Sequence, residues 1–157
     1  MSARDRGDRI VTTIGVALLV AYLAQAALGL ELPALVALQA DDTYKVGSGC
    51  VLAVYLLVQW SVGARRLYVA RAVVRHKLYG ALAPVFLYLH ATELAYGYLA
   101  VLAGVYVGNV ALGLAHRPLV RTRLRRFFGA WFVVHIVLSV ILVLLGCYHV
   151  AVALAYE

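Results

Sequence analysis

Five histidines are the residues of this chain whose type and spacing point most directly to chemistry. They are His76, His90, His116, His135 and His149. Four of them lie in or at the ends of two long apolar segments, where an ionisable side chain is uncommon and usually functional. His116 lies in a basic segment and is expected to be a solvated loop residue. A neutral imidazole binds metal ions, ligates haem iron or transfers protons, so the other four are candidate ligands.

The interval between the histidines is the same in both apolar segments. Fourteen residues separate His76 from His90, and fourteen separate His135 from His149. In helices packed at a small angle a residue returns to the same side roughly every 3.5 residues, so both histidines of a helix should face one side. The rise over this interval is about 21 Å. Each helix is therefore expected to present one imidazole in each leaflet of a membrane.

The two histidine-bearing helices are expected to run in the same direction, which sets His76 level with His135 and His90 level with His149. A flat macrocycle fits between two such helices, so the pairs predict two b-type haems, each held by two imidazoles. The distance of about 21 Å between the pairs argues against one zinc site of four histidines. A proton relay would more naturally include buried carboxylates, and Glu93 is the one candidate. Histidines that only pack and hydrogen-bond are the structural alternative.

The composition indicates that membrane helices position these histidines. Sixty-five per cent of the 157 residues are apolar, 13% are charged, and the mean hydropathy is +0.91. Long apolar runs at this level are typical of an integral membrane protein surrounded by lipid. The net charge of +7 is explained by basic cytoplasmic loops. Because the basic clusters adjoin apolar runs and no RNA-binding signature is present, we expect no nucleic-acid partner.

We expect an all-α integral membrane protein, a five-helix transmembrane bundle that forms a single domain over residues 1–157. The 38 residues from 78 to 115 carry one charge. As one helix they would extend about 57 Å, against a hydrocarbon core of about 30 Å, so they must turn, and 93–98 is the best place. The acidic segment 31–45 is expected to be a loop. The expected helices span about 10–30, 46–63, 75–96, 98–115 and 127–155.

The distribution of charge predicts the orientation of the chain. Lys and Arg gather in residues 1–9, 64–77 and 116–126, whereas the opposite ends of the helices carry acids and one lysine. Cytoplasmic loops collect positive residues. We therefore expect a cytoplasmic N-terminus, a C-terminus outside, and a multi-pass protein of the cytoplasmic (inner) membrane. The basic head and first apolar run also resemble a signal peptide, but an uncleaved first helix is preferred.

Cationic side chains at the inner membrane face are expected to reach the anionic propionates of an inner haem. The candidates are Arg71, Arg75, Lys77, Arg125 and Arg126. The preference of positive residues for the cytoplasmic side explains each of them equally well. The outer side has almost no cations, and propionates there would rely on Tyr96, Tyr98, water or a partner protein.

Four other features have a structural explanation. Trp131, one turn before His135, is expected in the interface belt or the core rather than against a haem. Pro84 should kink its helix. Cys50 and Cys147 lie in no C-x-x-C motif and are expected to be buried small apolar residues. The G-x-x-x-G at 104–108 favours close helix packing.

The histidine segments resemble the ferric-reductase-like transmembrane domain, the superfamily of ferric reductases and NADPH oxidases. The resemblance is carried by the run RHKLYG at 75–80 with His90, by the basic segment 117–126, and by the run WFVVH at 131–135 with His149. It covers about half the chain. It implies that His76 and His135 ligate an inner haem, and that His90 and His149 ligate an outer one. Many members also carry a sixth helix and a flavin and nucleotide domain, whereas this sequence has no G-x-G-x-x-G motif.

The expected function is transmembrane electron transfer through two bis-histidine b-type haems. The chain would be a membrane subunit of a larger redox system rather than a complete enzyme, and would draw electrons from a partner subunit, a quinol or a soluble carrier. Two alternatives stay open. One is a haem-based reductase acting on ferric iron, oxygen or a quinone at the outer side, which a vacant pocket there would favour. The other is a cofactor-free membrane scaffold.

Overall fold

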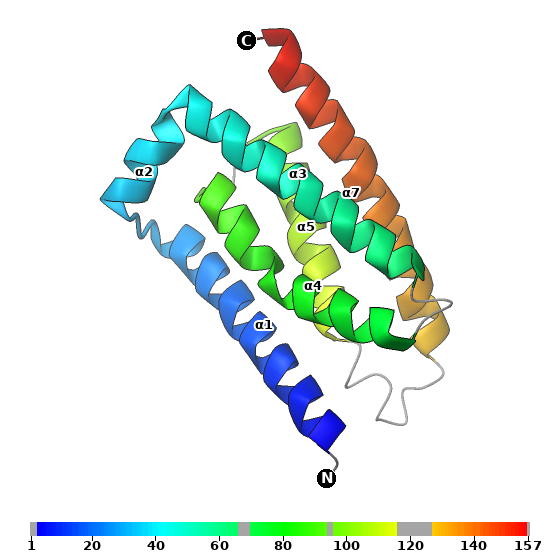
Figure 1. Ribbon diagram of the computed structural model, residues 1–157. Helices are drawn as coiled ribbons and strands as arrows, with labels where there is room; N and C mark the ends of the chain where they lie inside the picture. Colours follow the sequence, from blue (N-terminus) through cyan, green and yellow to red (C-terminus); the bar gives the residue numbers. More distant parts are fainter. Residues whose placement is uncertain (1–2, 66–69, 94–95, 116–126, 157) are drawn as a thin grey trace. The chain divides into compact units, whose positions relative to one another are not determined.

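Figure 1 shows the computed structural model of the chain, which describes residues 3–65, 70–93, 96–115 and 127–156. These residues form six helices and no strand. The helices are α1 (Ala3–Leu28), α2 (Pro33–Ala40), α3 (Asp42–Arg65), α4 (Ala70–His90), α5 (Tyr98–Leu114) and α7 (Phe128–Tyr156). The expected all-α class is confirmed for this part of the chain.

Three of the described helices contain segments long and apolar enough to cross a membrane. The segments are Arg6–Leu28 in α1, Asp42–Arg65 in α3 and Phe128–Ala155 in α7. α5 is apolar but shorter. α4 carries Arg71, Arg75 and Lys77 in its first half, which lowers its hydropathy. Membrane crossing by α4 and α5 stays a prediction.

Large apolar side chains are exposed along the helices. Val54 and Leu57 on α3 and Leu144 and Leu154 on α7 each expose more than half of their surface. In water such faces would favour aggregation, whereas in a bilayer they contact lipid tails at no cost. The apolar helices and their exposed side chains together indicate a membrane protein.

The chain folds as two compact units, residues 1–93 and residues 94–157. The N-terminal unit contains α1, α2, α3 and α4, and the C-terminal unit contains α5 and α7. The assembly of the helices into one five-helix bundle, and the sides on which the termini lie, stay predictions.

α4 is the central helix of the N-terminal unit, because both α1 and α3 pack on it. α1 runs parallel to α4: Asp8 pairs with Lys77 near the starts of the two helices, and Tyr22 packs edge-on against Tyr88 near their ends. Ala81 on α4 is almost fully buried, and its small side chain permits close helix packing. α3 runs antiparallel to α4 on the other side (Figure 1).

The segment 31–45, expected to be a loop, instead contains α2 and the first turn of α3. Pro33 starts α2, where a missing backbone N–H costs nothing because the first turn has no acceptor for it. The side chain of Asp41 accepts a hydrogen bond from the backbone N–H of Tyr44 at 2.8 Å and so caps α3. These local start signals outweigh the acidic composition of the segment.

α4 ends at His90 rather than near residue 96. The carbonyl oxygens of Tyr88 and Leu89 in its last turn accept hydrogen bonds from side chains of α2 and α3. The next helix begins at Tyr98, after Gly97, whose φ of 62° favours glycine. The predicted interruption of the long apolar run is therefore confirmed, and the direction of α5 relative to α4 stays a prediction.

Pro84 lies inside α4 and is buried. Figure 1 shows that α4 bends near its middle. A proline in a helix interior removes one backbone hydrogen bond and clashes with the preceding turn, which kinks the helix. The expected kink lies between His76 and His90.

In the C-terminal unit α5 and α7 pack side by side in antiparallel directions. Gly113 lies opposite His135, and Gly108 lies opposite Leu138. The buried residues are few, and Tyr106 on α5 with Trp131, His135 and Leu142 on α7 are the main ones. His135 is thus a buried histidine in the core of this unit.

Candidate functional site

The two histidines of α4 face the same neighbouring helix. A β-carbon on Gly63 would lie 3.2 Å from Cε1 of His76, and a β-carbon on Gly49 would lie 3.1 Å from Cε1 of His90. Both glycines belong to α3. Both imidazoles therefore pack against the backbone of one helix, and the prediction that the fourteen-residue interval sets them on one side is confirmed for α4.

The two glycines of α3 repeat the histidine interval. Gly49 and Gly63 are fourteen residues apart, like His76 and His90. Because the two helices are antiparallel, equal intervals bring each glycine opposite one histidine. A side chain at either glycine would need space that the imidazole now takes. The equal interval is visible in the sequence and would have identified α3 as the partner of the histidine helix.

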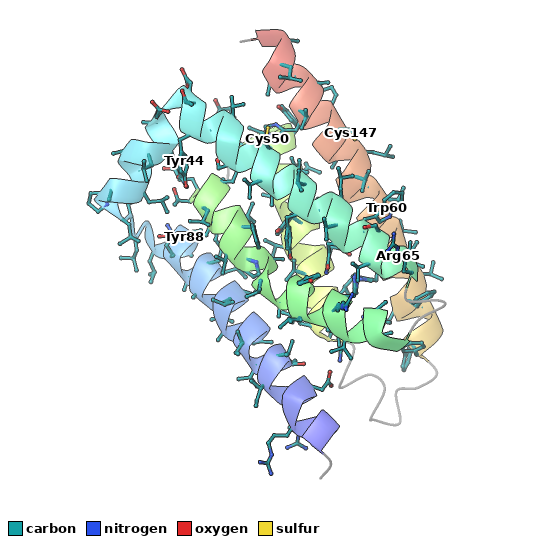
Figure 2. All side chains as sticks on the ribbon, in the orientation of Figure 1. Tyr44, Cys50, Trp60, Arg65, Tyr88 and Cys147 are labelled. Atoms are coloured by element: carbon teal, nitrogen blue, oxygen red, sulfur yellow. The ribbon has the colours of Figure 1, made fainter. Side chains whose placement is uncertain are left out.

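Side chains of α2 and α3 hold the end of α4 that carries His90. The amide nitrogen Nε2 of Gln39 donates to the carbonyl oxygens of Tyr88 at 3.0 Å and Leu89 at 3.2 Å. The hydroxyl of Tyr44 donates to the carbonyl of Leu89 at 2.9 Å. Figure 2 shows Tyr44 and Tyr88 at the same end of the N-terminal unit. Because the last carbonyls of a helix lack helical partners, these bonds fix the turn that presents His90.

The ring of His90 also contacts a hydroxyl. Oγ of Ser48, on the first turns of α3, lies 3.1 Å from Nδ1 of His90. The same Oγ lies 3.2 Å from the carbonyl oxygen of Lys45. Ser48 was not among the residues predicted from the sequence, and its signal there is its place beside Gly49.

The other end of α4 is held through the backbone of His76. Nε2 of Gln59 on α3 donates to the carbonyl oxygen of His76 at 2.8 Å. A β-carbon on Gly80 would lie 3.0 Å from the same nitrogen, so Gly80 leaves room for this amide. The Gln59 bond and the Gly63 contact together fix both the backbone and the ring of His76.

The cationic residues expected near an inner haem differ in their surroundings. Lys77 forms an ion pair with Asp8 of α1, and both side chains are mostly buried. Arg75 is exposed. Arg71 lies on α4, but its side chain, together with Arg125, Arg126 and His116, falls outside the described residues. The role of all five cations at propionates stays a prediction.

His135 lies in the core of the C-terminal unit between Trp131 and Gly113. The rings of Trp131 and His135 are stacked, with centroids 5.7 Å apart and planes 5° apart. The indole Nε1 of Trp131 donates to the carbonyl oxygen of Leu112 at 2.8 Å. A β-carbon on Gly113 would lie 3.6 Å from Cε1 of His135. Trp131 is buried, which agrees with the expected core position, and it also fixes the plane of the imidazole.

His149 contacts the first residue of α5. The hydroxyl of Tyr98 lies 3.4 Å from Nδ1 of His149, and the two ring centroids are 6.3 Å apart. Both histidines of α7 therefore face α5, so the same-side prediction is confirmed for this helix as well. Tyr98 was expected to contact outer propionates, and here it contacts a histidine ring. Tyr96 is 92% exposed.

Cys50 and Cys147 are free and exposed, so the expectation that they are buried is wrong. Both lie on apolar helix faces, where a thiol behaves as a small apolar group toward lipid. In the G-x-x-x-G pair, Gly108 faces Leu138 of α7, whereas a β-carbon on Gly104 would have no atom within 4 Å. Close packing therefore involves one glycine of the pair.

The chemistry of the donor set is that of haem ligands. Haem iron takes two axial ligands from protein, and each histidine helix supplies two imidazoles on one side. Glycines next to His76, His90 and His135 let each imidazole lie close to the backbone of the neighbouring helix. Within the described residues no group of three or more His, Cys, Asp or Glu side chains gathers to hold a bare metal ion.

A cavity of about 410 Å³ lies at the His90 end of the N-terminal unit. It is an open groove between the start of α3 and the end of α4, and its walls are mostly apolar. The lining residues are Tyr44, Gly47, Ser48, Val51, Phe86 and Leu89. Because Ser48 also contacts His90, one hydroxyl connects the cavity with the candidate ligand.

Comparison of the chain with protein-family models, curated proteins and solved structures finds no match.

Proposed function

We propose that the chain transfers electrons across a membrane through two b-type haems, as the membrane subunit of a larger redox system. His76 and His135 would hold the inner haem, and His90 and His149 the outer one. The pairing across the two units rests on the sequence intervals and on the proposed direction of the helices.

The observation that carries this proposal is the repeated interval with its matching glycines. On α4 and on α7 the two histidines face a single neighbouring helix, and on α3 the glycines recur at the same spacing as the histidines they contact. Packing alone requires neither two imidazoles per helix nor a glycine opposite each imidazole of α4. Two haem-ligand sites about 21 Å apart along each helix would account for the two histidines and for the glycines beside them.

The residues of the chain would position and electrically tune each site. Haem iron held by two imidazoles changes between the ferric and ferrous states, and so carries one electron at a time. Gln39, Tyr44 and Gln59 hold the backbone of the ligand helix, and Trp131 holds the plane of His135. Arg75 and Lys77 are the described cations beside His76, where they would balance propionate charge.

We further propose the membrane part of the ferric-reductase-like class, in the cytoplasmic membrane with the N-terminus inside. The basic residues before α1 and around the start of α4 support this orientation. The electron donor would be a quinol or a protein domain outside these 157 residues, which contain no G-x-G-x-x-G motif.

Vesicles test the function directly. The purified chain is reconstituted with haem in lipid vesicles that contain ferricyanide, and dithionite is added outside. Wild-type protein and the His116→Ala control should reduce the trapped ferricyanide at similar rates. His76→Ala and His90→Ala should each fall to the rate of protein-free vesicles. Wild-type rates equal to those of protein-free vesicles would refute the function.

The cavity beside His90 favours a second candidate function, reduction of an acceptor at the outer side. Its lining residues include the aromatic Phe86 and the hydroxyl-bearing Tyr44 and Ser48, and none of the lining residues is acidic. This chemistry suits a small neutral quinone better than ferric iron, which prefers carboxylate ligands. Two electrons, taken one at a time from the outer haem, and two protons from the outer medium would convert the quinone to a quinol.

A cavity-filling variant separates this candidate from simple conduction. Val51→Phe should slow reoxidation of the dithionite-reduced protein by a short-chain quinone, because the larger ring narrows the cavity. Val54→Phe changes an equally exposed residue on the same helix outside the cavity lining, and should leave the rate unchanged. Equal rates for the two variants would rule out a quinone site in this cavity.

A further inference from the structure

Ser48 has two hydrogen-bonding partners and one hydroxyl proton. Its Oγ lies 3.1 Å from Nδ1 of His90 and 3.2 Å from the carbonyl oxygen of Lys45. A carbonyl oxygen can only accept a hydrogen bond, so both contacts are hydrogen bonds only in the arrangement in which the hydroxyl donates to Lys45. The lone pair of Oγ then faces Nδ1, which must carry a proton to complete the contact. The chain of bonds therefore runs from His90 through Ser48 to Lys45.

This chain of bonds determines which nitrogen of His90 can bind a metal. A neutral imidazole has one N–H and one lone pair, and the bond made by the first nitrogen fixes the role of the second. With the proton on Nδ1, the lone pair lies on Nε2. We infer that Ser48 is a positioning residue that holds His90 as the Nδ1–H tautomer, with Nε2 as the ligand to the outer haem iron, an inference that rests on the proposed haem function.

The surroundings of Ser48 support a role at the ring rather than in the helix alone. Ser48 is partly buried and adjoins Gly49, whose missing side chain lets the imidazole approach α3. Ser61, on the last turns of the same helix, donates only within its own helix, to the carbonyl of Val58 at 2.9 Å. The two serines thus form a matched pair, one beside a histidine ring and one confined to α3.

An N–H bond from a ligand histidine to an oxygen raises the basicity of the ligand and stabilises ferric iron. Loss of the Ser48 bond should therefore raise the midpoint potential of the outer haem and weaken its binding, by roughly tenfold or more. The inner haem, about 21 Å away along the helix, should keep its potential. Tyr98 makes the corresponding contact with Nδ1 of His149 at the longer distance of 3.4 Å, so Tyr98→Phe should have a smaller effect.

The first test uses the full chain before haem is added. Nitrogen-15 NMR of histidine-labelled protein, with His90 assigned by the His90→Ala variant, reports the tautomer directly. Wild-type, Ser61→Ala and Ser48→Thr proteins should show His90 protonated on Nδ1. Ser48→Ala should show a substantial Nε2–H population. A wild-type His90 with its proton on Nε2, or an unchanged tautomer in Ser48→Ala, would overturn the inference.

The second test is a redox titration of the haem-loaded protein. Ser48→Ala should raise one of two midpoint potentials, Ser48→Thr should restore it, and Ser61→Ala should leave both unchanged. Equal shifts of both potentials, or none, would overturn the role of Ser48. If the chain binds no haem, the proposed function fails, and the NMR measurement still decides the tautomer. Failure of the haem function and failure of the Ser48 inference therefore give different results.

Discussion

The imidazole of His90 lies against the backbone of Gly49, so closely that a β-carbon at residue 49 would stand 3.1 Å from Cε1 and 3.7 Å from Nδ1 of the ring. His76 and Gly63 repeat this relationship one histidine interval away, at 3.2 Å and 3.3 Å. Contacts between a β-carbon and another heavy atom are rarely this short. The two glycines therefore set where each ring of α4 can lie.

Gly49→Ala should displace the His90 ring by a few tenths of an ångström and weaken the outer haem selectively. Gly63→Ala should displace the His76 ring and weaken binding of the inner haem. Ligand geometry that is disturbed at one axial position lowers haem affinity, by roughly tenfold to a hundredfold on the scale of second-shell changes at metal sites. Haem titration of the apo-protein, followed optically, measures both affinities.

Gly47→Ala is the matched control for these variants. It lies on α3 two residues from Gly49, and a β-carbon there would have no atom within 4 Å. Alanine also has the higher helix propensity, so all three variants gain similar intrinsic helix stability. Haem affinities that respond to Gly47→Ala as strongly as to Gly49→Ala would show that the glycines do not act through the histidines.

Trp131 should report occupancy of the inner site through its fluorescence. The chain has two tryptophans, so Trp60→Phe leaves Trp131 as the single emitter, stacked on His135. Haem should quench this emission strongly, and His135→Ala should restore more of it than His149→Ala, because the second histidine is about 21 Å farther along the helix. Equal recovery in the two variants would contradict an inner haem at His135.

The ion pair between Asp8 and Lys77 should stabilise the packing of α1 on α4. The pair is partly shielded, with side chains 32% and 19% exposed, whereas Asp42 in the Asp42–Lys45 pair is 88% exposed. Asp8→Asn should cost about 1 kcal/mol and lower the melting temperature by roughly 2–4 °C, and Asp42→Asn should cost less. Thermal unfolding in detergent measures both, and a larger loss for Asp42→Asn would contradict the role of the pair.

Periodicity and charge predicted the helices better than their ends. The break between α4 and α5 follows from the length of the apolar run, and Gly97, with its positive φ, directly precedes α5. The end of α4 at His90 depends on Gln39 and Tyr44, which are distant in sequence and donate to its last carbonyls. α2 was missed because an acidic composition was given more weight than the proline at its first position.

The candidate site was predictable only in part, because some of its contacts depend on how two helices are aligned. The histidine interval is a property of one helix, and it correctly placed both rings of α4 on one side. Ser48 and Gly49 belong to the neighbouring helix, and their contacts with His90 follow from the antiparallel register of α3 and α4. A single sequence gives that register only when intervals on two segments are compared.

The most direct test of the account is the haem content of the purified chain and of its four single histidine variants. A pyridine haemochrome assay with electron paramagnetic resonance should show about two low-spin b-type haems per wild-type chain, each held by two imidazoles. His76→Ala and His135→Ala should lose the same haem, and His90→Ala and His149→Ala should lose the other. A chain without haem, or a single haem that survives His90→Ala but not His76→Ala, would contradict the two-haem arrangement.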